Sequence, residues 1–188
     1  MGRDTTAMRR FKSMYNGLGL NQADTFHKSK LLLSVYRDVV WATICKSDEL
    51  RSETGSLYGH ELGPALVYLT EFAPTQEREL FEDRLTFLFE TKWMIELIDS
   101  AMAKVLAYHR NGRVYFEILS KSYLAEHKYS ETEILELLAL SRTSYYELRR
   151  EAVTLLGIAL WGYALPKMRG IFTGGEPSGF FRADTLRT

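Results

Sequence analysis

The sequence predicts an all-α protein, with an N-terminal helical region followed by a C-terminal helix-turn-helix domain. Apolar residues recur every three or four positions through long stretches, and several stretches begin with a residue that can cap a helix. Four prolines and thirteen glycines are too few to separate the many short strands of a β-sandwich. We therefore expect a flexible arm over 1–20, a helical region over 21–111 with a role in oligomerisation, a helix-turn-helix domain over 112–166 and a flexible tail over 167–188.

The composition narrows the class of protein without pointing to a partner. The 188 residues include 24 basic and 24 acidic side chains, so the formal net charge is zero. Cys45 is the only cysteine, which excludes an intramolecular disulfide and favours a reducing, cytoplasmic location. The most apolar run, 153–165, is about half the roughly 20 residues that a membrane-spanning helix needs. We expect a buried helix there and no membrane partner.

Three helices are expected in the N-terminal half, and the shortest of them covers about 63–71, before Pro74. Asn21 can cap a helix that continues to about Cys45. The longest helical pattern covers 76–109, with apolar residues on more than one side. This helix must be covered either by neighbouring helices or by a second subunit. A homo-oligomer is the preferred interpretation.

Clear helix boundaries mark the C-terminal half. A helix is expected over 113–125. Ser130 followed by Glu133 forms a capping box, which opens a short second helix. Ser141 can cap a third helix, and Pro166 is expected to end it.

The short helix, the turn and the second capped helix have the layout of a helix-turn-helix, whose second helix enters the DNA major groove. On that helix four polar residues are spaced i, i+3, i+4, i+7 and therefore share one face. Arginine can pair with guanine, glutamate can accept from cytosine, and threonine can contact a base or a thymine methyl. We expect base contacts from Thr143, Tyr146, Glu147 and Arg150, and phosphate contacts from Arg142, Ser144 and Arg149.

The segments YFEILSKSYL, SETEILELLALS and SRTSYYELRREAVTLL, within 114–156, resemble known DNA-binding proteins. They are similar to region four of bacterial sigma factors, and more closely to the ArpU/RinA-type activators of late genes in phages of Gram-positive bacteria. The resemblance implies a transcriptional regulator that binds double-stranded DNA at promoters, with RNA polymerase as a further partner. Two positions differ from the family pattern, which usually has a small residue at Leu135 and Gly, Asn or Asp at Ala139. Alanine is less suited than glycine to a positive φ.

Two other functions remain open on the sequence. One is a DNA-packaging adaptor similar to small terminase subunits, and the other is a structural helical protein in which 142–150 is only a solvated surface. An enzyme is not expected. The four histidines lack HExxH or HxH spacing, and Cys45 has no neighbouring base. We therefore predict no catalytic residue, no metal site and no cofactor.

Overall fold

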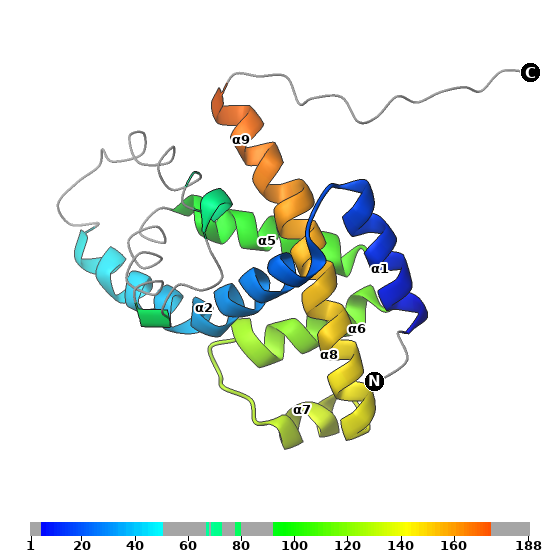
Figure 1. The fold of residues 1–188 in the computed structure, drawn as a ribbon. Coiled ribbons are helices and arrows are strands. Elements are labelled where there is room, and N and C mark those ends of the chain that lie inside the picture. The colour runs from blue at the N-terminus through cyan, green and yellow to red at the C-terminus, as the bar shows by residue number, and fades with distance from the viewer. Residues whose placement is uncertain (1–4, 51–66, 68, 73–77, 80–91, 174–188) are drawn as a thin grey trace, which may run out of the picture.

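The computed structural model describes residues 5–50, 67, 69–72, 78–79 and 92–173, and all regular elements within these ranges are helices (Figure 1). The all-α class is therefore confirmed for this part of the chain. None of these helices is long and apolar enough to cross a membrane. The elements are α1 (Thr6–Gly17), α2 (Gln22–Leu50), α5 (Lys92–Leu106), α6 (Gly112–Leu119), the π-helix η1 (Ser120–Leu124), α7 (Glu131–Leu137), α8 (Arg142–Gly157), the π-helix η2 (Ile158–Ala164) and α9 (Leu165–Thr173).

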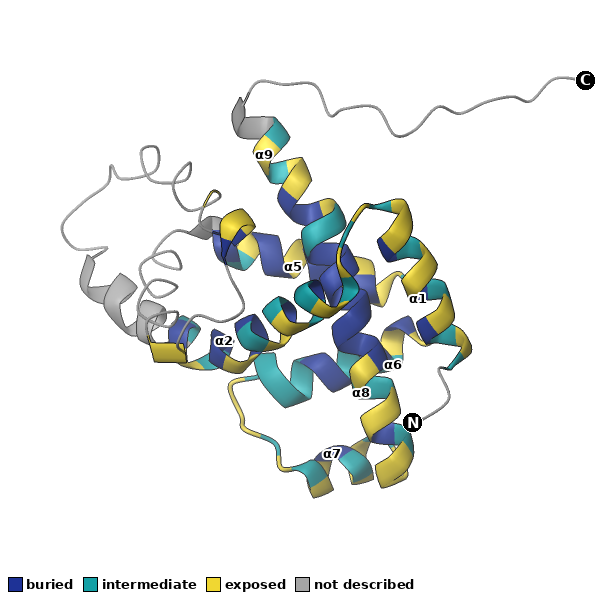
Figure 2. Cartoon of the chain, in the orientation of Figure 1, coloured by how far each residue is buried: buried dark blue, intermediate teal, exposed yellow. Residues whose placement is uncertain are grey.

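Helix α8 is the central element, because α1, α2, α5 and α6 all pack against it (Figure 1). Its inward face carries apolar side chains at helical spacing: Tyr145, Ala152 and Leu155 are buried, and Leu148 is half-buried. From residue 151 to residue 160 every side chain is buried, as the dark-blue run in Figure 2 shows. One end of α8 is therefore fixed in the core from all sides.

Pro166 does not end the helical path, contrary to the sequence prediction. It is the second residue of α9, which continues to Thr173. The π-helical turn of η2 comes directly before, with the Leu165 N–H bonded to the Leu160 carbonyl. Pro166 therefore falls in the first turn of a new α-helical segment, where a missing N–H is tolerated. The expected tail is wrong for residues 167–173, and residues 174–188 lie outside the described part.

The expected flexible N-terminal arm is also wrong for the described residues 5–20. Thr5 caps α1 by accepting from the Met8 N–H at 3.2 Å. Met8, Phe11 and Tyr15 are buried, and the Tyr15 hydroxyl donates to the carbonyl of Thr154 at 2.9 Å. The arginines and lysine of this segment raise its average polarity, although its apolar residues keep helical spacing. Helix α1 is part of the core.

Two helices of the N-terminal half end at other residues than the sequence predicts. Asn21 caps α2 as predicted, with its Oδ1 accepting from the Asp24 N–H at 3.0 Å, but the helix runs past Cys45 to Leu50. Helix α5 ends at Leu106, three residues before the predicted end of the 76–109 pattern. Residues 76–77 and 80–91 of that pattern lie outside the described part.

The buried side of α5 is covered by the same chain. Met94, Leu97, Ala101 and Val105 are buried in a core cluster that also takes residues from α1, α2, α6, α8 and η2. For α5, the first of the two expected alternatives, coverage by neighbouring helices, is therefore present. The homo-oligomer stays a prediction. The expected domain boundary between residues 111 and 112 lies within this core. At that point Gly112 packs so closely that a Cβ would lie 2.6 Å from the Val105 carbonyl oxygen.

Candidate nucleic-acid interface

Helices α7 and α8 form a two-helix corner, which we define as residues 130–150. The predicted capping box is present at its start: the Ser130 N–H donates to Glu133 Oε2 at 2.7 Å, and the Glu133 N–H donates to Ser130 Oγ at 3.3 Å. Ser141 caps α8 by accepting from the Ser144 N–H at 3.2 Å. Between the helices Ala139 adopts a φ of +50°, the left-handed conformation that glycine adopts more easily.

A small apolar cluster holds the corner together. Ile134 of α7, Tyr145 of α8 and Ile118 of α6 are its buried members. Helix α6 therefore packs behind the corner. Six half-buried side chains surround the cluster: Val114, Tyr129, Leu135, Leu138, Leu140 and Leu148.

The predicted reading residues lie on the opposite, solvent-exposed side of α8. Thr143, Tyr146, Glu147 and Arg150 are all exposed, in the yellow part of α8 beside α7 (Figure 2). Within the described residues, no side-chain hydrogen bond or ion pair engages Thr143, Glu147 or Arg150. The face that the spacing predicts therefore exists, and most of it points to solvent.

Glu131, the first residue of α7, contacts two of the predicted DNA-binding residues. Its Oε1 pairs with Arg142 Nε at 2.9 Å, and its Oε2 accepts from the Tyr146 hydroxyl at 2.6 Å. The Tyr146 hydrogen bond, followed by the charge of Arg142, lowers the pKa of the Glu131 carboxyl. Arg142 keeps 75% of its side chain exposed. No sequence pattern predicts this contact, because Glu131 and Arg142 are eleven positions apart and are joined only through the turn.

Arg149 is bound within the fold and does not project with the others. Its Nε and Nη2 donate to the Tyr123 hydroxyl at 2.9 and 2.6 Å, and its guanidinium lies 5.1 Å from the centre of the Tyr123 ring. Burial raises the pKa of Tyr123, although Arg149 acts against this shift. Ser144 is half-buried, and its hydroxyl accepts from Ser141 Oγ at 2.9 Å. The expected phosphate contacts of Arg149 and Ser144 therefore compete with existing partners.

The surface charge of the corner is mixed. Arg142, Arg149 and Arg150 supply three positive charges on α8, and Glu147 lies among them. Helix α7 adds three glutamates, Glu131, Glu133 and Glu136. Long-range attraction to DNA at this surface is therefore weak, and individual contacts must carry recognition.

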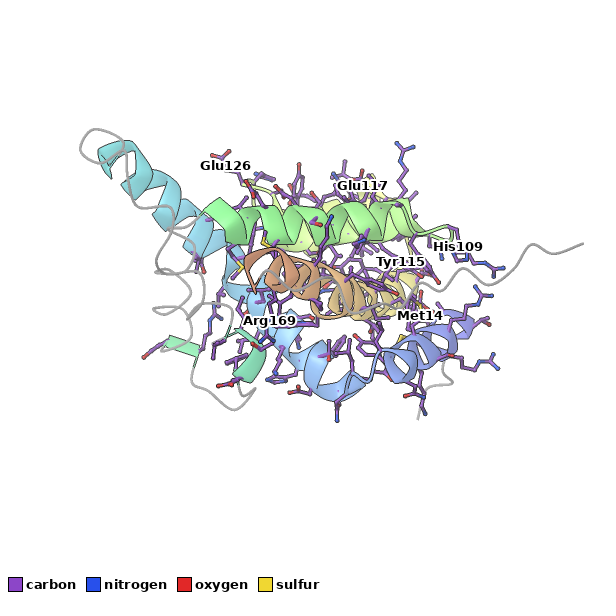
Figure 3. The ribbon with its side chains drawn as sticks, turned by 90° about the horizontal axis from the view of Figure 1, so that it is seen from above. Met14, His109, Tyr115, Glu117, Glu126 and Arg169 are labelled. Atoms are coloured by element: carbon purple, nitrogen blue, oxygen red, sulfur yellow. The ribbon has the colours of Figure 1, made fainter. Side chains whose placement is uncertain are left out.

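Elsewhere a buried carboxylate ties three elements together. Glu151 of α8 accepts hydrogen bonds from the Thr5 hydroxyl and, at 2.7 Å, from the Tyr115 hydroxyl. Burial, and then the Glu151 contact, raises the pKa of Tyr115, which lies in the interior of the bundle (Figure 3). Because both partners are hydroxyl donors inside the fold, this group has a structural role.

An open cavity of about 460 Å³ lies where the start of α2 meets η2 and α9. Lys28 borders it, paired with Asp24 at 3.2 Å and placed 5.8 Å from the centre of the Trp161 ring. Among the described side chains, no group of three or more His, Cys, Asp or Glu residues is placed to hold a metal ion. The cavity and its paired charges indicate no particular ligand.

Comparison with known proteins adds no relative: no family model matches the chain, and no similar curated protein or solved structure is found. The resemblance to phage activators thus depends on the amino-acid sequence of residues 114–156.

Proposed function

We propose that this protein binds double-stranded DNA in a sequence-specific manner and regulates transcription, with the first nine residues of α8 as the reader. The observation that carries the proposal is the change of environment along one helix. Residues 142–150 are mostly exposed and polar, whereas residues 151–157 are buried throughout. A helix whose second half is fixed in the core can offer the exposed face of its first half to a major groove without losing its own packing.

The contacts within the corner divide the expected DNA-binding residues into two groups. Thr143, Glu147 and Arg150 are exposed and are the better candidates for base edges. Arg149 is held by Tyr123 and supports the corner from inside. The base-reading set is thereby smaller than the spacing alone predicts.

The biological setting follows from the resemblance of residues 114–156 to late-gene activators of phages. It supports a phage or prophage regulator that acts at promoters in the cytoplasm, with RNA polymerase as a second partner. A homo-oligomer would bring two readers to two half-sites and so raise specificity. Light scattering at high protein concentration tests this part, and a strict monomer would remove it.

Arg150→Ala tests the reader directly. Fluorescence anisotropy with DNA from the protein's own locus should show binding that weakens as salt increases. Loss of a bidentate arginine–guanine contact should weaken binding to the preferred site by about 1–3 kcal/mol. Arg110→Ala, an exposed arginine in the turn between α5 and α6, is the matched control and should leave specificity unchanged. Equal effects of the two variants would contradict the assignment of the reader.

Mapping of bound DNA distinguishes the two other functions. Occupancy of promoters upstream of late genes, together with co-purifying RNA polymerase, supports the regulator. Ring-shaped oligomers at a packaging site, with a large terminase ATPase, would favour the packaging adaptor. Absence of salt-sensitive DNA binding by the full chain would leave the structural helical protein.

A further inference from the structure

The Glu131 carboxylate occupies two hydrogen-bond donors on the proposed reading surface. Each of its oxygens has one partner: Arg142 Nε at 2.9 Å and the Tyr146 hydroxyl at 2.6 Å. Arg142 and Tyr146 are four positions apart, so they lie one turn apart on the same side of α8. Together they form a donor pair that holds an anion with two oxygens.

This contact lies at the surface. Arg142 is 75% exposed at its side chain, Glu131 is 34% exposed and Tyr146 is 46% exposed. Exposed pairs of this kind contribute little to stability and exchange partners easily. A phosphodiester also offers two oxygens, and it carries a full negative charge that such donors bind well.

We propose that Arg142 and Tyr146 form a phosphodiester-binding subsite that the Glu131 carboxylate occupies in the free protein and leaves when DNA binds. This inference rests on the proposed function and changes one assignment within it: the Tyr146 hydroxyl contacts the DNA backbone and not a base. Because the exchange is the same for any DNA, Glu131 lowers the affinity for specific and unrelated duplexes by the same factor. Discrimination is left to Thr143, Glu147 and Arg150.

Glu131→Gln removes the charge with almost no change of shape. We expect it to bind the preferred duplex and an unrelated duplex about three- to fivefold more tightly, which matches the upper range for an exposed ion pair. Glu136→Gln removes the same charge from an exposed position on the same helix and should change the affinity by less than about twofold. Circular dichroism and the unfolding midpoint show that both variants are folded.

Tyr146→Phe separates a phosphate contact from a contact that serves Glu131 alone. A hydroxyl that binds phosphate makes Tyr146→Phe weaken DNA binding about threefold, also in the Glu131→Gln background. If the hydroxyl only held Glu131 in place, Tyr146→Phe would tighten binding as Glu131→Gln does, and this would overturn the subsite.

The remaining outcomes separate this inference from the function on which it rests. Equal affinities of Glu131→Gln and Glu136→Gln, or weaker binding by Glu131→Gln, overturn the exchange while the wild-type protein still binds DNA. Binding by Glu131→Gln alone supports the exchange in its strongest form. If neither the wild-type protein nor Glu131→Gln binds DNA in a salt-sensitive manner, the proposed function and the subsite are both overturned.

Discussion

The main core and the corner are stabilised in different ways, although α8 runs through both. Among the described residues, the core cluster collects buried apolar side chains from α1, α2, α5, α6, α8, η2 and α9. The corner cluster has three buried members, Ile118, Ile134 and Tyr145. The capping box of Ser130 and Glu133 adds local stabilisation at the start of α7. Extensive burial therefore sets the position of α8, and the small cluster around Ile134 sets how α7 packs upon it.

Phe11→Ala should have the largest effect on this comparison. The side chain is fully buried between α1 and the rest of the core, next to Tyr108 and Tyr115. Its removal should lower the free energy of unfolding by about 3–5 kcal/mol, measured by urea denaturation. Lys12→Ala, an exposed neighbour on α1, should stay within about 0.5 kcal/mol. If Phe11→Ala left the free energy of unfolding unchanged, this would favour the predicted flexible N-terminal arm over the packed helix.

The matching change in the corner is Ile134→Ala. Ile134 is 2% exposed but belongs to a small cluster, so the loss should be near the lower limit for such substitutions, about 2 kcal/mol. Amide hydrogen exchange should rise in α7 while α5 stays protected. An equal rise in both helices would show that the corner and the core unfold as one unit.

Ala139→Gly should sharpen the comparison by a smaller amount and in the opposite direction. The residue has a φ of +50°, which an L side chain adopts at a cost of about 1–2 kcal/mol. Glycine removes this strain but has more freedom in the unfolded chain, so we expect a net gain of about 0.5–1 kcal/mol. A lower unfolding midpoint in the variant would mean that the turn does not need the left-handed conformation.

Acid should weaken the corner slightly before the core. Tyr146, and then Arg142, lowers the pKa of Glu131, and the backbone and hydroxyl of Ser130 lower that of Glu133. A folded-state pKa below the unfolded one gives stability that is present above the usual glutamate range and is lost as the pH falls through the folded-state values. Hydrogen exchange of α7 followed against pH should show this loss. The double variant Glu131→Gln, Glu133→Gln should flatten the profile.

The sequence predicts features that depend on neighbouring residues and misses those that depend on distant ones. The Ser130–Glu133 box and the Ser141 cap are local, and the residue types alone indicate them, whereas the left-handed turn at Ala139 is suggested only by the family resemblance. The path through Pro166 depends on the π-helical turn before it, which no residue type specifies. Exposure of the reading face follows from helical spacing. Its occupation by Glu131 depends on how α7 crosses α8, which packing decides.

Two polar contacts of helix α1 join residues that lie far apart in the chain. Thr5 and Tyr15 bind Glu151 and Thr154, which follow them by 146 and 139 residues in the chain. These two contacts of α1 can therefore form only after α8 has been synthesised. Closing so long a loop is slow, so these contacts are expected to form late in folding. The core is thus completed by the same helix that presents the proposed reading surface.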